Sequence, residues 1–166
     1  MGYQPGRRSI STRGGTIYRE KEGKMNPKEI IQEKVNKFKR EINYQLNLDV
    51  SDSYSPYEKH EDLKKGEHPF PNSGSPGVYV FWPNNNDRPL YIGKSSDAIG
   101  NRVWAHLGRW GPSSDPYPDA EKWLKEKLRD VLLYTIPFPK EHRYLSSALE
   151  EFLIKELGPL QNRVLK

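Results

Sequence analysis

The sequence contains no cysteine, which excludes disulfide bonds, thiolate zinc sites and a cysteine nucleophile. It also lacks any run of about 18 apolar residues, the length that a membrane-spanning helix requires. The N-terminus is polar and bears arginines, without the apolar stretch of a secretory signal peptide. Together these absences favour a cytoplasmic protein with no membrane partner.

Apolar residues are also few, at 34% of the chain against 30% for charged residues. This composition allows only a small core, as expected of one domain with an appendage in a chain of 166 residues. The net charge of +5 is unevenly spread. Residues 1–24 hold six Lys or Arg and two Glu, whereas the other 142 residues hold 21 basic and 20 acidic side chains.

The surplus of positive charge therefore lies in residues 1–24, where no helical or strand period persists. We expect a flexible basic arm there. Arginines bind nucleic-acid phosphates, so the arm is a candidate DNA contact, with a solvated tail as the alternative. The candidate DNA-binding residues are Arg7, Arg8, Arg13 and Arg19.

Residues 25–48 are expected to form an amphipathic helix, because Asn26, Pro27 and Glu29 give a capped helix start. Apolar residues then recur at steps of three and four, at Ile31, Val35, Phe38, Ile42 and Leu46. This stripe predicts packing on the domain core; a homodimer contact or presentation of lysines to DNA is the alternative. Residues 49–73, rich in Ser, Pro and Gly, are interpreted as a linker or an irregular wrap.

Residues 77–93 have the pattern of a β-hairpin, with alternating apolar residues in two strands and turn-forming Pro and Asn between them. Tyr79 and Tyr91 occupy matching places on the two strands. A half-buried hairpin with amphipathic tyrosines at its edge is the structural alternative. A helix follows directly, because apolar residues recur every four positions at Ile99, Val103 and Leu107. Arg102 and His106 share a neighbouring face of that helix and could converge with the tyrosines on one cleft.

The rest of the chain predicts a helix capped by Asp119, a strand over 131–136, and a last helix that Gly158 ends. The fold class that we expect is α/β (α+β). It consists of a small, mainly antiparallel three-stranded sheet flanked by helices, with the N-terminal basic arm and helix before it.

Two adjacent glutamates lie on the last predicted helix. Glu151 and Lys155 form an i, i+4 pair that is typical of a solvated surface. Glu150 lies beside the apolar stripe instead, where a carboxylate is costly and more often functional. We therefore interpret Glu150 as the functional one.

The residues Gly77-Val78-Tyr79, followed after eleven residues by Tyr91-Ile92-Gly93, resemble the signature pair of the GIY-YIG nucleases. The resemblance covers residues 74–166, with Val78 replacing the isoleucine of the first motif. It implies a DNA endonuclease that hydrolyses phosphodiester bonds and places its site at Tyr79, Tyr91, Arg102, His106, Glu150 and Asn162.

The chemistry suits these residue types. Glu150 would hold one Mg²⁺ or Mn²⁺ ion, since hard cations prefer carboxylate oxygens. Arg102 offers a planar fork for the charge that develops on phosphorus. Tyr79 is the expected base, and because a phenol has a pKa of about 10, positive charge from Lys94 and Arg102 would have to assist it. Tyr91 would assist or position, His106 would relay a proton or bind phosphate, and Asn162 would orient groups near the metal.

Other interpretations stay open at this point. A nuclease-like module could bind DNA without cutting it, and an unrelated α/β interaction domain would cut nothing. Among nucleases, the short chain with its added arm and helix favours a restriction or stand-alone enzyme over a repair, structure-specific or mobile-element enzyme. A homodimer is compatible with the amphipathic helix.

Overall fold

The structure, a computed structural model, describes residues 25–64, 70–109, 111 and 114–162. The arm and its four candidate arginines lie outside the described residues. The fold is built on three antiparallel strands in the order β2-β1-β3, which confirms the predicted sheet. The strands are β1 (Gly77–Pro83), β2 (Tyr91–Ser95) and β3 (Val131–Pro137).

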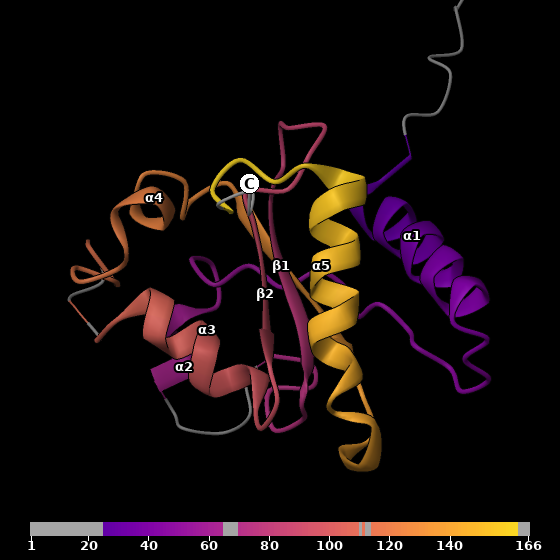
Figure 1. Cartoon of the computed structure of the whole chain (residues 1–166). Helices are drawn as coiled ribbons and strands as arrows, with labels where there is room; N and C mark the ends of the chain where they lie inside the picture. The colour runs from indigo at the N-terminus through magenta and orange to yellow at the C-terminus, as the bar shows by residue number, and fades with distance from the viewer. Residues whose placement is uncertain (1–24, 65–69, 110, 112–113, 163–166) are drawn as a thin grey trace, which may run out of the picture.

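Helices cover both faces of this sheet (Figure 1). On one face lie α1 (Pro27–Glu41) and α5 (Leu145–Leu157). On the other lie α2 (His60–Lys64), α3 (Ile99–Leu107) and α4 (Lys122–Lys125). A one-turn 3-10 helix, η1 (Lys140–His142), precedes α5.

The central strand β1 is buried on both sides because each face has its own apolar cluster. Val78, Val80 and Trp82 pack under α1 and α5. Tyr79 and Phe81 face α3 and α4. Tyr79 is only 1% exposed, so the alternative of a half-buried hairpin with edge tyrosines is wrong for this residue.

Helix α1 begins as predicted, with the Asn26 and Glu29 capping box in place. It ends at Glu41, however, and not at residue 48. Asn43 adopts a left-handed conformation with φ 52°, and Tyr44 turns inward to hydrogen-bond the His142 imidazole at 2.8 Å. The last part of the apolar stripe therefore stays outside the helix and uncovered; Ile42 and Leu46 are 42% and 44% exposed.

The segment interpreted as a linker or wrap runs partly along β3. The Ser51 amide donates to the Thr135 carbonyl at 2.9 Å, and Tyr54 and Leu133 exchange backbone hydrogen bonds. Residues 51–54 thus cover the outer edge of β3, which would otherwise leave a row of backbone groups unpaired.

The C-terminal half follows the sequence prediction closely, with one difference. The predicted strand is β3, and Gly158 ends α5 in a left-handed conformation with φ 55°. The helix expected after Asp119 is a single turn, and Glu121 is the residue before it. No helix in the described part of the chain is long and apolar enough to cross a membrane.

Candidate active site

The candidate site lies at the edge strand β2, where α3 and α5 approach from opposite faces. Tyr91 points to the α3 face and belongs to its core cluster. Lys94 points to the α5 face and donates a hydrogen bond to the Ser147 hydroxyl at 2.7 Å. Glu150 on α5 and Arg102 on α3 both act on the pKa values of the two tyrosines, so groups from both faces meet here.

A chain of hydrogen bonds runs from Tyr79 into the α3 face. The Tyr79 hydroxyl lies 2.8 Å from His106 Nε2. On the other side of the ring, His106 Nδ1 lies 2.7 Å from Glu121 Oε1. The imidazole is 8% exposed, so both of its nitrogens are satisfied by protein groups in a largely dry setting.

Aromatic rings enclose this imidazole. The Tyr91 ring lies edge-on to His106 with centroids 4.9 Å apart and stacks on Trp123, also at 4.9 Å. The Trp123 indole donates to the second carboxylate oxygen of Glu121. Burial acts to raise the pKa of Glu121, but the hydrogen bonds from His106 and Trp123 outweigh it and lower the pKa.

Gly93, the glycine of the second signature motif, lies on the edge strand β2 directly against the rings of Tyr79 and Tyr91. A Cβ at this position would approach the Tyr79 hydroxyl oxygen to 2.4 Å and the Tyr91 ring to 2.8 Å. Both approaches are closer than van der Waals contact allows. Only glycine therefore lets the two rings lie together at this point.

Burial dominates the titration of the two phenols. It raises the pKa of Tyr79 far above the ordinary value, and Tyr91 adds to the rise, while Arg102 acts in the opposite direction. Burial also raises the pKa of Tyr91; the Glu150 carboxylate adds to this, and Tyr79 and Arg102 oppose it. Arg102 thus assists Tyr79 as the sequence predicted, but burial outweighs its effect.

Glu150 is half-buried and Glu151 is exposed, as the helix pattern predicted. Burial raises the pKa of Glu150, Lys94 lowers it, Glu151 raises it and Arg102 lowers it, with a net rise. A carboxylate that is shielded from water gains from binding a positive charge directly.

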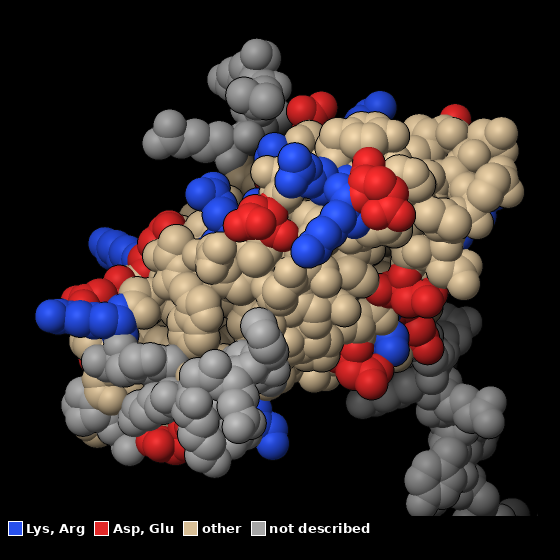
Figure 2. Space-filling view, turned by 90° about the horizontal axis from the view of Figure 1, so that it is seen from below, with Lys and Arg blue, Asp and Glu red and all other residues tan. Residues whose placement is uncertain are grey.

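A hollow of about 380 Å³ adjoins these groups and is lined by Lys94, Ser95, Ser96, Asp97, Asn101 and Arg102. It offers two cations beside Glu150, which suits a phosphate. Across the face seen in Figure 2, acidic and basic side chains are interspersed, and the described residues form no broad patch of one sign there. A nucleic acid would therefore be held on this part of the chain by individual cationic side chains and not by a broad positive potential.

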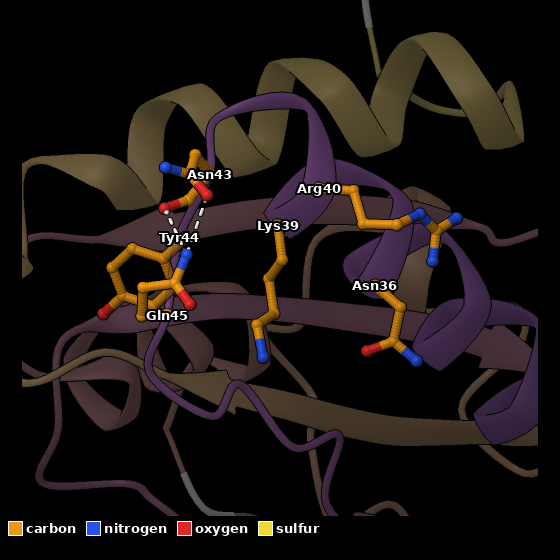
Figure 3. Close-up of a pocket in the computed structure, with 6 residues that line it drawn as sticks. All are labelled: Asn36, Lys39, Arg40, Asn43, Tyr44 and Gln45. Atoms are coloured by element: carbon orange, nitrogen blue, oxygen red, sulfur yellow. Dashed lines mark hydrogen bonds between the residues drawn. The ribbon is translucent and has the colours of Figure 1, made fainter.

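A second hollow, of about 360 Å³, lies at the C-terminal end of α1 (Figure 3). It is lined by Asn36, Lys39, Arg40, Asn43, Tyr44 and Gln45. The Gln45 amide closes one side by donating to the backbone and side-chain oxygens of Asn43 at 3.2 and 2.7 Å. None of the predicted site residues lines it.

Asn162 contacts the edge strand β2 through its side chain. Its side-chain oxygen accepts from the Ile92 amide at 2.8 Å, and its side-chain nitrogen donates to the Ile92 carbonyl at 2.6 Å. The preceding residues Leu160 and Gln161 donate to the carbonyls of Pro89 and Leu90. The C-terminal segment thus pairs with the edge strand, and the role of Asn162 in orienting groups near the metal stays a prediction.

No family model matches this chain, and no curated protein matches it. Solved structures of the N-terminal GIY-YIG endonuclease domain of UvrC from Thermotoga maritima do. The domain bound to magnesium is 30% identical, and the match covers 62% of this chain and 98% of that domain, with a TM-score of 0.41. A tyrosine-to-phenylalanine point mutant is 29% identical over 63% of this chain and 98% of that one, with a TM-score of 0.42.

This chain belongs to the GIY-YIG endonuclease family. Sequence identity along nearly the whole neighbouring domain decides the assignment, and the low TM-scores carry no weight in it. Its three-stranded antiparallel sheet with flanking helices is consistent with the α/β fold of this family.

All seven site residues named from the sequence gather around β2 in this GIY-YIG chain: Tyr79, Tyr91, Lys94, Arg102, His106, Glu150 and Asn162. Sequence reasoning missed Glu121, which follows an irregular loop 15 residues after His106. No period or motif links the two positions, so no signal in the sequence alone could have found this pair.

Within the residues that the structure describes, no group of three or more His, Asp or Glu side chains gathers to form a closed metal cage. Two carboxylates lie near the hollow: Asp97 lines it and is exposed, whereas Glu150 is half-buried and feels the charges of Lys94 and Arg102. Mg²⁺ commonly binds through one or two carboxylates and keeps several waters, so these residues fit one such ion and not a pair.

Proposed function

We propose that this GIY-YIG protein is a divalent-metal-dependent endonuclease that hydrolyses phosphodiester bonds in DNA. The observation that carries the proposal is the position of Glu150, a half-buried carboxylate with a raised pKa between Lys94 and Arg102. The Thermotoga maritima UvrC domain is bound to magnesium, and it remains bound to its divalent cation when an asparagine is replaced by alanine. We therefore expect a divalent cation in this chain too and assign Glu150 as its carboxylate ligand.

The chain's own groups divide the work of hydrolysis. Arg102 is exposed on α3, so its guanidinium fork can bind phosphate oxygens and stabilise the charge that grows on phosphorus. Lys94 holds α5 against β2 through Ser147 and keeps a second cation beside Glu150. A divalent cation held by Glu150, with water and phosphate oxygens as further ligands, would neutralise charge on the phosphate.

Tyr91 is the phenol that meets the attacking water in this proposal. The sequence favoured Tyr79, but that side chain is 1% exposed. Tyr91 is only partly buried, and the charge of Glu150 is second only to burial among the causes that raise its pKa, whereas for the pKa of Tyr79 it is the smallest cause. Tyr91 therefore lies between the metal carboxylate and the buried hydrogen-bond chain.

The finer role that we propose is a restriction or stand-alone nuclease. In support, α1 and the wrap along β3 precede the residues that carry the signature motifs, and α1 is tied to α5 by Lys37 and Glu156 at 2.9 Å. Contact between the basic arm and DNA, a homodimer and a cytoplasmic location remain predictions.

Nicking of supercoiled plasmid tests the central proposal. The wild type should nick with Mg²⁺ or Mn²⁺ and should stop when EDTA is added. Glu150→Ala should bind DNA in Ca²⁺ and fail to nick. Binding without cutting by the wild type under every metal condition would favour the non-catalytic module, and sequencing of the cut ends would separate a restriction enzyme from a structure-specific one.

A further inference from the structure

We propose that the proton of the attacking water leaves through a relay from Tyr91 to Tyr79 to His106, with His106 Nε2 as the final acceptor and Glu121 as the positioning residue that fixes the imidazole tautomer. This inference rests on the proposed function. It assigns Glu121, which lies outside the signature motifs, a role in the reaction.

The direction of the hydrogen bonds follows from Glu121. An ionised carboxylate only accepts, so His106 must present Nδ1–H to it across the 2.7 Å contact. A neutral imidazole then has a bare Nε2 on its other side. The Tyr79 hydroxyl, 2.8 Å away, must donate to that nitrogen. The two phenols hydrogen-bond each other, and because the Tyr79 proton points to His106, Tyr79 accepts from Tyr91.

A negative charge on either buried phenol would be unfavourable. Burial raises the pKa of both, and for Tyr79 it does so strongly. A relay removes this difficulty, because each tyrosine gives up one proton as it takes another and stays neutral. The charge that forms is the positive one on His106, beside a carboxylate that is itself kept ionised by its hydrogen bonds.

The proton balance is complete. As the water oxygen forms its bond to phosphorus, one water proton passes to the Tyr91 oxygen, the Tyr91 proton passes to Tyr79, and the Tyr79 proton passes to His106 Nε2. The bond between phosphorus and the leaving oxygen breaks, and that oxygen takes a proton from solvent. His106 returns its extra proton to solvent after the product has left.

Glu121 is held at His106 by more than its side chain. Its backbone amide donates to the His106 carbonyl at 3.0 Å, so the residue is fixed to the end of α3 at two points. Gly108, two residues beyond His106, allows the backbone of Asp119, just before Glu121, to approach the end of α3. A Cβ on Gly108 would meet the Asp119 backbone at 2.8 Å. The side chain itself is 46% exposed, and the hydrogen bonds of its two oxygens to His106 and Trp123 direct the carboxylate to the imidazole.

The first test compares Glu121 variants with a matched control, Glu126→Gln, an exposed glutamate at the end of the same short helix. Single-turnover cleavage of plasmid should fall about 10-fold in Glu121→Gln and about 100-fold in Glu121→Ala. DNA affinity in Ca²⁺ should be unchanged in both, and Glu126→Gln should match the wild type. Equal cleavage in Glu121→Ala and the control would overturn the relay.

A double-variant cycle asks whether Glu121 acts through His106. Glu121→Ala placed in a His106→Gln background should cost no further rate, because the imidazole that it positions is gone. Losses that multiply would mean that Glu121 acts independently and would overturn the positioning role.

The tautomer gives a readout that does not depend on activity. In ¹⁵N spectra of the histidine side chains, assigned with His106→Gln, the wild-type ring should carry its proton on Nδ1, and Glu121→Ala should shift the population towards Nε2–H. A wild-type ring protonated on Nε2 would overturn the relay. A wild type that shows the expected tautomer but cuts no DNA would instead overturn the proposed function and, with it, the proton path.

Discussion

The two faces of β1 show what burial does in different chemical settings. On the α1 and α5 side, Val78, Val80 and Trp82 lie in a cluster of almost wholly apolar groups. On the α3 and α4 side, the equally buried Tyr79 brings a hydroxyl that must find a partner, and His106 supplies it. Burial on the first face yields stability alone, whereas on the second it also fixes hydrogen-bond direction and raises pKa values.

Helix α5 contributes side chains both to the apolar cluster and to the candidate active site. Leu149 and Leu153 lie in the apolar cluster, fully buried. Glu150, one residue on, is turned about 100° around the helix axis and reaches the edge of β2, where Lys94 and Arg102 act on it. The packing of one face thus sets the position of the carboxylate that serves the other.

The largest expected effect follows from removing that carboxylate. Glu150→Ala should lower the cleavage rate on the order of 1000-fold, because a bound cation contributes several kcal/mol to the transition state. DNA affinity measured without metal should hold or rise, since a negative charge near phosphate is lost. Glu151→Ala, on the exposed side of the same helix, is the matched control and should cut normally. An inactive Glu151→Ala with an active Glu150→Ala would reverse our assignment.

Arg102→Lys should have the next largest effect. The substitution keeps the charge but loses the planar fork that matches a phosphate, so cleavage should fall about 100-fold. Thermal stability should hardly change, because Arg102 is exposed. Plasmid nicking and a thermal melt on the same preparation test both statements. Near-normal turnover would reduce Arg102 to a residue that only attracts phosphate.

One substitution on each face of β1 sharpens the comparison directly. Tyr79→Phe keeps the ring but removes the hydroxyl that contacts His106, so cleavage should fall about 100-fold while the free energy of unfolding falls by about 1 kcal/mol. Val80→Ala should do the reverse, with a loss of about 2 kcal/mol of unfolding free energy and a nearly unchanged rate. Urea titrations and nicking assays measure the two quantities. A folded Val80→Ala protein without activity would contradict the separation of the faces.

Local periodicity explains why much of this arrangement could be predicted. Strand alternation placed the tyrosines, and the four-residue spacing placed Arg102 and His106 on one helix face. The same logic distinguished Glu150 from Glu151. These inferences need only the geometry of a single element.

Features that depend on contacts between distant segments could not be predicted in this way. Helix α1 ends early because Tyr44 finds a partner in His142, 98 residues away. Asn162 binds the backbone of Ile92, 70 residues before it. The pairing of His106 with Glu121 depends on a loop of irregular structure, and the burial that raises the pKa of Tyr79 depends on the whole α3 face.

The smallest expected effect concerns stability and the charge of Glu150. Because its pKa is raised in the folded protein, folding favours the protonated form. That contribution is fully present below the unfolded value of about 4.5 and is lost as the pH rises through the folded pKa. At pH 7 in EDTA, Glu150→Gln should therefore melt a few degrees above the wild type, and the difference should shrink as the pH falls below about 4.5. Glu151→Gln, with an exposed side chain, should show no such dependence.

Addition of Mg²⁺ should raise the melting temperature of the wild type alone, since only the carboxylate binds the ion. A Glu150→Gln protein that is less stable than the wild type at pH 7 in EDTA would mean that Lys94 and Arg102, and not burial, dominate the setting of this carboxylate.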